Sequence, residues 1–467
     1  MLTIAEPVTA YPYIPNALPE IQQRMLREIG LDSIDQLYDT IPQHIRFRDS
    51  LDLPPAIRSE ADLRAHIEAL LSDNRHTGHN LSFLGGGCAR HYVPAVCDEI
   101  AQRGEYLTAY VGDPHISPGK YQALFEYQSM LGALTGMLVV TPPTYDGSGA
   151  AASSLAMAAR ITGRRRVLLL GAISADRRSQ FETFLSPTVN IDQVGWDLKT
   201  GLISETELQA KLGDDVAAVY FECPSYLGFI DSQARQLTAM AKASGALSVV
   251  YVDPISLGVL AAPRDYGADI VCGDLQSLGL HMNAGGGLAG FIATPDEERF
   301  VAENPAILIS GAPKPGGQGW SFAWCTFDRT SYIKREDTQD YYGTTQWLWG
   351  IIAGVYMALM GPHGLAEVGE TISQRAAYLR RLISAIDGVT VMAPETPCFK
   401  EFVIRFDHSA VTVAEVNDRL RVQGIFGGKD LSGEFPELGQ SALCCVTEQH
   451  NKKDLDRFVQ ALSEVIR

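Results

Sequence analysis

Short apolar runs that end in polar residues or glycine recur between residues 81 and 330, and helical segments separate several of them. Four such runs are Arg166-Val-Leu-Leu-Leu-Gly, Ala217-Ala-Val-Tyr-Phe-Glu, Leu247-Ser-Val-Val-Tyr-Val-Asp and Ala268-Asp-Ile-Val-Cys-Gly. Strands that are apolar throughout are buried on both faces, and intervening helices favour a mainly parallel sheet. The pattern therefore predicts an α/β fold with a ligand site at the carboxyl ends of the strands, where Glu222, Asp253 and Asp274 stand.

The remaining segments predict a helical arm and a small C-terminal domain. Residues 1–80 carry helical spacing after Pro19 and a capping residue at Ser33. Two helices are expected on either side of Gly361-Pro362, and the tail reads strand, strand, helix, strand, helix. We thus expect an arm at 1–80, a large domain at 81–340, connecting helices at 341–387 and a small α+β domain at 388–467.

Composition excludes several classes of protein. The chain has 467 residues and a net charge of −17, without the basic stripe that nucleic-acid binding needs. The N-terminus lacks a signal-peptide pattern, and the longest apolar run, around 347–360, is too short and polar for a membrane span. The eight cysteines form no C-x-x-C pair, and His91 and His115 stand apart from other ligands, so we expect free thiols, no metal and a cytoplasmic location.

The segment Asp269–Phe291 reads buried strand, polar loop, glycine run and second strand. Aminotransferase-like enzymes that use pyridoxal phosphate (PLP) carry their Schiff-base lysine in such a loop, but this loop holds Gln276, whose amide is not a nucleophile. The chain is therefore not expected to bind PLP covalently by itself. Gly285–Gly290 matches G-x-G-x-x-G, yet a strand and not a helix is expected after it, which favours a glycine turn over a dinucleotide site.

Three further features have two readings each, and a fourth supports only a weak hypothesis. Asp253 could pair with a pyridinium nitrogen, but we favour a helix cap or structural support because the lysine is missing. The turn Tyr145–Gly149 could cradle a phosphate or simply begin a close-packed helix. The charged stretch 329–336 could bind an anion or face solvent. Lys314 is the only loop lysine near the later strands, which makes an independent PLP enzyme a weak hypothesis.

Motifs along nearly the whole chain resemble those of one known family. They are Tyr13-Ile-Pro-Asn16, Leu53-Pro-Pro55, Phe83-Leu-Gly85, His91-Tyr-Val-Pro-Ala95, Ile116-Ser117 with Gly119, Gln122-Ala-Leu-Phe-Glu-Tyr-Gln128, Leu134-Thr-Gly136, Tyr145-Asp-Gly147, Tyr266-Gly-Ala-Asp-Ile270, Gly361-Pro-His-Gly364, Gly427-Gly428 through Pro436-Glu-Leu-Gly439, and Cys445-Val-Thr-Glu448. The chain resembles glycine decarboxylase, the P-protein of the glycine cleavage system, and specifically subunit 1 of its two-subunit form.

This resemblance implies a fold-type-I, aspartate-aminotransferase-like PLP architecture in which an α and a β subunit form a heterodimer that pairs further into a heterotetramer. The β partner carries the lysine and PLP, and the α chain completes the site, with Gln276 where the lysine would be. In the family, glycine loses its carboxyl group as CO2, and the aminomethyl group passes to a lipoyl group on the carrier H-protein.

Some segments depart from the family pattern. They are 110–115, 173–177, 286–288 and 338–346. The residues expected to contribute to the shared cleft are Tyr110, His115, Tyr145, Asp146, Asp253, Tyr341, Thr344 and Thr345. Two alternatives remain open: a paralogue that acts on a modified glycine or another amino acid, and a regulatory or scaffolding subunit without a catalytic role.

Overall fold

The structure is a computed structural model that describes residues 13–49, 51–107, 118–325, 340–343, 345–407 and 411–466. The chain divides into two units, residues 1–74 and residues 75–467. Tyr110, His115 and Thr344, and the charged stretch 329–336, lie outside the described residues. The fold of each unit is given below by itself.

The described residues of the first unit form two helices and two 3-10 turns, with almost no core. Its elements are η1 (Pro15–Ala17), α1 (Pro19–Glu28), η2 (Ile34–Tyr38) and α2 (Glu60–Ser72). Ser59 caps α2 by accepting a hydrogen bond from the Asp62 amide, as expected of a capping residue. Among the described residues of this unit only Leu26 is a buried hydrophobic residue, whereas Phe47 is 64% exposed. The unit therefore lacks the apolar burial that stabilises an independent domain.

The second unit is built on a seven-stranded sheet in the order β2-β8-β7-β6-β5-β3-β4. Its strands are β2 (Val139–Val140), β3 (Arg166–Leu170), β4 (Asn190–Val194), β5 (Val216–Glu222), β6 (Leu247–Val252), β7 (Ile270–Asp274) and β8 (Gly290–Thr294). Pairings from β4 through β7 are parallel, and β8 and β2 are antiparallel to their neighbours. The four apolar runs are strands β3, β5, β6 and β7, which confirms the mainly parallel sheet.

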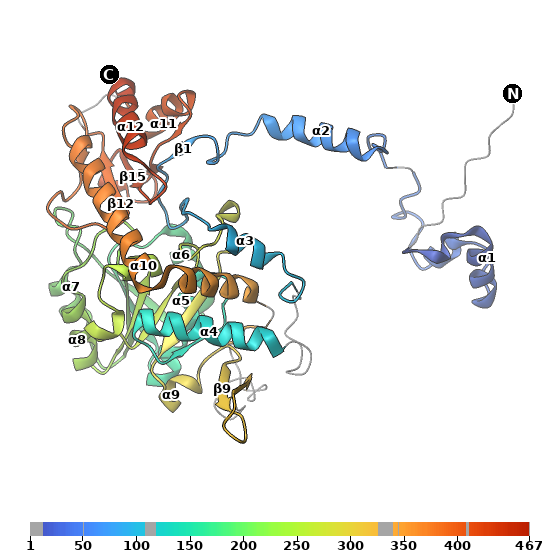
Figure 1. The fold of residues 1–467 in the computed structure, drawn as a ribbon, viewed down its shortest axis with the longest axis horizontal. Coiled ribbons are helices and arrows are strands. Elements are labelled where there is room, and N and C mark those ends of the chain that lie inside the picture. The colour runs from blue at the N-terminus through green and yellow to red at the C-terminus, as the bar shows by residue number, and fades with distance from the viewer. Residues whose placement is uncertain are drawn as a thin grey trace. The chain divides into compact units, whose positions relative to one another are not determined.

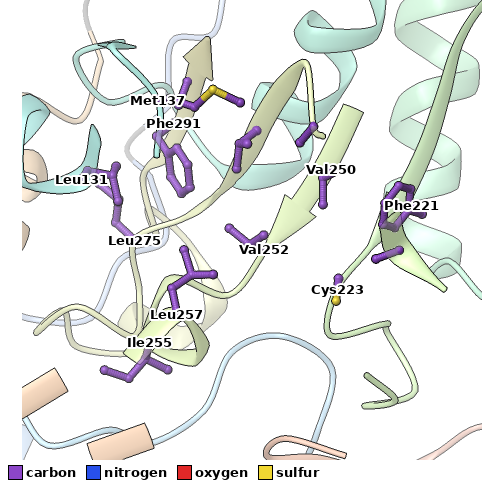
Figure 2. Packing of buried hydrophobic residues seen from close by; sticks show 14 of the residues in the cluster. Leu131, Met137, Phe221, Cys223, Val250, Val252, Ile255, Leu257, Leu275 and Phe291 are labelled. Atoms are coloured by element: carbon purple, nitrogen blue, oxygen red, sulfur yellow. The ribbon is translucent and has the colours of Figure 1, made fainter. Parts of the chain in front are cut away.

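Helices cover both faces of this sheet (Figure 1). They are α3 (Ala95–Ala101), α4 (Pro118–Thr135), α5 (Gly147–Thr162), α6 (Ala175–Leu185), α7 (Glu205–Lys211), α8 (Ala234–Ala243) and α9 (Glu298–Val301). Alternate residues of one strand serve opposite cores: Phe221 packs with α4 and α8, and Tyr220 packs with α5 and α6. Figure 2 shows part of the first core, where Phe221, Val250, Val252, Leu275 and Phe291 lie together.

The C-terminal part forms a second sheet, in the order β11-β12-β15-β14, joined to the rest by one long helix. Its elements are α10 (Trp347–Ile383), β11 (Thr390–Val391), β12 (Glu401–Arg405), α11 (Val413–Val422), β13 (Ile425–Phe426), β14 (Lys429–Asp430), β15 (Ser441–Cys445) and α12 (Lys452–Val465). The expected order of strands and helices in the tail is confirmed. Strands β13 and β14, the parallel partner β1 (Leu81–Ser82) of β13, and the hairpin of β9 (Ile309–Pro313) and β10 (Trp320–Trp324) were not expected.

Helix α10 bends where two helices were expected. Gly361 has φ +58° and ψ −178°, a conformation that glycine adopts without strain, and Pro362 follows it. Within the described residues α10 alone is long and apolar enough to match a membrane span in length and composition. Its residues Ile352 and Met357 nevertheless belong to the core on one face of the sheet, and Ala376 belongs to the core of the C-terminal part.

Candidate functional site

A small cavity lined by many polar residues lies at the carboxyl ends of β5, β6 and β7, the edge that the strand pattern predicted. Its lining includes Gly86, Gly87, Ser174, Arg177, Glu222, Tyr251, Asp253, Asp274, Ser277, Lys400 and Glu401. The free volume is only about 60 Å³. This space suits only a few water molecules, whereas small-molecule pockets measure roughly 300–1,000 Å³.

Gln276 follows β7 but does not line this cavity. Its side chain is buried, with 1% of the residue exposed. The amide oxygen accepts a hydrogen bond from the Ala89 amide at 3.2 Å, and the amide nitrogen donates to the Leu280 carbonyl at 3.1 Å. Gln276 is therefore a satisfied core amide that ties the loop after β7 to the segment around Ala89.

Asp253 is held on both carboxylate oxygens. Oδ2 pairs with the Lys400 ammonium at 2.6 Å, and Oδ1 accepts hydrogen bonds from the Ser277 hydroxyl at 2.6 Å and the Ile255 amide at 3.3 Å. Burial acts to raise the pKa of Asp253, but the charges of Lys400 and His91 hold that pKa below its ordinary value. The Ile255 contact is the helix cap expected for Asp253, and the Lys400 pair adds a structural ion pair.

Lys400 lies directly before β12 and is itself buried. Burial acts to lower the pKa of its ammonium, but Asp253 raises that pKa above its ordinary value. His91 lies next to the ammonium, with Nε2 at 3.5 Å from Nζ, and its Nδ1 contacts the Glu448 carboxylate at 2.9 Å. A lysine held so firmly as a cation is a poor nucleophile, because nucleophilic attack requires the neutral amine.

Arg177 fills the other side of the cavity. Its guanidinium donates to the carboxylate of Glu222, and its Nε donates to the Ser148 hydroxyl at 3.2 Å. The guanidinium carbon lies 3.8 Å from the centroid of the Tyr251 ring, a cation–π contact. Burial acts to lower the pKa of Arg177, but Glu222 raises it above its ordinary value, so the side chain remains a cation.

Two more carboxyl groups border the cavity, and burial raises the pKa of both. Asp274 accepts hydrogen bonds from the Tyr251 hydroxyl at 2.8 Å and from the backbone N–H of Gln276 at 3.0 Å. The neighbouring Asp253 charge raises the pKa of Asp274 further. Glu401 accepts from the amides of Gly86 at 2.7 Å and Gly87 at 3.3 Å. The raised pKa values reduce the negative charge that these two groups bring to the cavity.

Two other residues expected in a shared cleft, Tyr145 and Asp146, directly precede α5, whose first turn adjoins the cavity through the contact of Ser148 with Arg177. Asp146 caps this helix, because Oδ1 accepts a hydrogen bond from the Gly149 amide at 2.6 Å. Tyr145 is 47% exposed, and its ring packs edge-on against Tyr342 at a centroid distance of 5.3 Å. Tyr341 is 43% exposed, and Thr345 is half-buried. The capping contact favours a close-packed helix start over a phosphate cradle, since the Asp146 carboxylate already occupies the N-terminus of α5.

Neither cation of the cavity was among the residues predicted to form a site. Arg177 closes the segment 173–177 that departs from the family pattern, so that departure was the available signal. No sequence pattern indicated Lys400, because this residue belongs to the C-terminal tail and contacts Asp253 only in the folded chain. Lys314 is exposed and does not line the cavity. Within the described residues no His, Cys, Asp and Glu group could hold a metal, and all eight cysteines are free.

The residues of this cavity do not fit PLP. The position after β7 offers an amide and not an amine, and the one lysine in the lining is paired with Asp253. A space of about 60 Å³ is far smaller than a pocket for such a ligand. Covalent binding of the cofactor would require both an amine and a larger space.

The fold places the chain in a well-defined class. A sphingosine-1-phosphate lyase from Burkholderia pseudomallei covers 91% of this chain and 94% of its own at a TM-score of 0.66 and 14% identity. A NifS-like protein covers 83% and 99% at a TM-score of 0.60 and 12% identity. These likenesses confirm the expected α/β fold, the architecture called fold type I.

Closer relatives identify the family. The model of the glycine cleavage system P-protein matches residues 12–462, and the chain belongs to this family. A probable glycine dehydrogenase (decarboxylating) subunit 1 from Staphylothermus marinus is 36% identical over 98% of each chain, and one from Thermococcus onnurineus is 34% identical over 97% and 99%. An inhibitor-bound crystal structure of glycine decarboxylase (P-protein) covers 96% and 98% at a TM-score of 0.84 and 32% identity.

The contacts of Gln276 predict that restoring a lysine there does not restore the cofactor site. In Gln276→Lys the Ala89 amide loses its acceptor and an ammonium enters a buried position, so we expect a loss of stability on the order of 3 kcal/mol. Added PLP should produce no imine absorbance in the visible. Gln460→Lys, on the exposed face of α12, is the control and should unfold like the wild type. A stable variant with a visible band would contradict the prediction.

Proposed function

We propose that this chain is the lysine-free α subunit of a two-subunit glycine decarboxylase and that it completes an active site whose PLP is held covalently by a β partner. The main observation behind this proposal is Gln276, a buried amide in a family whose chemistry requires an amine. The substrate is glycine, which loses its carboxyl group as CO2. A lipoyl group on a carrier H-protein takes up the aminomethyl group, and the reaction takes place in the cytoplasm.

The names of the relatives support this division between two chains. Both relatives are named subunit 1, and each matches this chain over nearly its whole length. The first unit supports a partner as well, because many of its apolar side chains are exposed in this unit described by itself. We propose an αβ heterodimer that pairs further into a heterotetramer, with 1–80 as the arm, 81–340 as the large domain, 341–387 as connecting helices and 388–467 as the small domain.

Within this proposal the shared cleft lies near the start of α5. Tyr145 and Tyr341 expose their rings there, and Asp146 caps the helix. The Thr345 hydroxyl is buried and makes no hydrogen bond within the part of the chain that the structure describes, which suits a polar group of a partner. Tyr110, His115 and Thr344 remain proposed members. The role of these side chains is to orient the substrate and to shield the partner's site from water.

Co-expression with a lysine-bearing P-protein subunit from the same source tests the proposal. We expect the pair to co-purify as a PLP-bearing protein and to exchange the glycine carboxyl group with labelled bicarbonate when H-protein is present. Each chain alone should give no exchange. Exchange by the lysine-bearing chain alone at the full rate would refute a role in completing the site. Turnover of another amino acid, without glycine exchange, would refute glycine as the substrate.

A further inference from the structure

The cavity at the ends of β5, β6 and β7 lies where proteins of this fold class bind their ligand, yet it is nearly full. Two cationic side chains occupy the space, and they come from segments that do not belong to these strands. Arg177 lies on α6, and Lys400 is the residue directly before β12. The cations in this space are thus side chains of the chain itself.

Lys400 occupies the cation position next to Asp253. A carboxylate that ends this strand suits the ring nitrogen of a pyridinium cofactor, and here its Oδ2 pairs with the Lys400 ammonium at 2.6 Å. The two side chains are 7% and 19% exposed, so the pair is largely removed from water. Because β12 belongs to the C-terminal sheet, this pair joins that sheet to the end of β6.

Arg177 occupies the space above the Tyr251 ring. Its flat guanidinium stacks at 3.8 Å from the ring centroid and pairs with Glu222, whose side chain is only 4% exposed. A planar cation on an aromatic ring fills the kind of slot in which a flat ligand ring would lie. This contact joins the start of α6 to the ends of β5 and β6.

We propose that the chain has converted its former cofactor pocket into an internal lock, in which Lys400 and Arg177 replace the cofactor and hold the C-terminal sheet and α6 against the large sheet. His91 and Glu448 extend the lock, because the His91 ring lies between the Lys400 ammonium and the Glu448 carboxylate. Removing one member of a buried pair leaves a charge without compensation, and removing both members does not. The lock does not depend on which substrate the assembled enzyme uses.

A double-mutant cycle on the full-length chain tests the first half of the lock. Lys400→Met leaves Asp253 unpaired, so we expect its midpoint of thermal unfolding to fall by several degrees. Lys400→Met combined with Asp253→Asn should recover part of that loss, which gives a clear coupling between the two positions. The control pair is Arg166 with Asp215, an ion pair at 2.7 Å in which Asp215 is 59% exposed, and the cycle with Arg166→Met and Asp215→Asn should show little coupling.

Chemical rescue tests the second half and serves if Lys400→Met fails to fold. In Arg177→Ala the guanidinium space is empty, so millimolar ethylguanidinium should raise the unfolding midpoint of the variant but not that of the wild type. Ethylurea has a similar shape without the charge and should not rescue. Additive effects in the Lys400–Asp253 cycle, or no rescue by ethylguanidinium, would overturn the lock. Neither readout involves glycine turnover, so failure of the lock and failure of the proposed function are distinguishable.

Discussion

Removal of residues 1–74 is expected to abolish association with the lysine-bearing subunit while the remaining chain still folds. The second unit contains its own cores on both faces of the sheet and in the C-terminal part, so its folding does not require the first unit. The first unit has the opposite character, since its large side chains are exposed and Leu26 alone is a buried hydrophobic among its described residues. Co-purification of the truncated chain with a tagged partner subunit measures the effect.

Helix α2 offers a sharper form of this experiment. Leu63, Ile67, Leu70 and Leu71 recur at helical spacing and form one apolar stripe, with exposures from 43% to 57%. If the stripe is buried on the partner, Leu63→Asp or Ile67→Asp should each cost about 2–3 kcal/mol of association, roughly 30- to 150-fold in affinity.

Ala65→Asp provides the matched control, because Ala65 lies on the opposite side of the same helix and is exposed. This variant adds the same charge to α2 and should associate normally. Normal association of the truncated chain or of the stripe variants would show that the arm is not an interface with the lysine-bearing subunit. Loss of self-association alone, with pairing to that subunit intact, would instead assign the arm to a second copy of this chain.

Gly228→Ala is expected to be the most damaging small substitution in the second unit. A Cβ atom at Gly228 would lie 1.9 Å from the Glu401 carbonyl oxygen, and the backbone φ of +92° is one that alanine rarely adopts. Left-handed strain and overpacking each cost about 1–3 kcal/mol, so the total should be on the order of 4 kcal/mol. The neighbouring strand end that carries Lys400 would have to shift, and Asp253 would lose its partner with it.

Thermal unfolding of the full-length chain measures this loss. Gly433→Ala is the control, because Gly433 has open space around its Cβ position and no positive φ, so the midpoint should stay within about a degree of the wild type. Equal midpoints for the two variants would mean that the backbone at Gly228 and Glu401 is not packed as closely as the structure describes.

Much of the fold could be predicted because its signals are local. The apolar runs of β3, β5, β6 and β7 predict buried strands, and the Gly361-Pro362 pair predicts the kink in α10. A strand, β8, follows the glycine run as predicted, and this context does not fit a G-x-G-x-x-G dinucleotide site. The hairpin of β9 and β10 was missed, since its residues are largely exposed and carry no continuous apolar run.

The cavity could be located from sequence, but its contents could not. Glu222, Asp253 and Asp274 follow their strands, and parallel strands bring such ends to one edge of the sheet. The cations that neutralise two of these carboxylates come from elsewhere, since Arg177 belongs to α6 and Lys400 to the tail. No local pattern of residues encodes which distant side chain meets a given carboxylate.

The sequence by itself determined that this chain has no lysine after β7 and therefore no amine for a cofactor at that place. It also determined the sheet that brings the carboxylates together. Only the tertiary structure decided what became of the pocket, because burial and close contact between remote segments set its charges and its volume. In the folded chain Lys400 neutralises Asp253 and Arg177 stacks on Tyr251, and about 60 Å³ remains free.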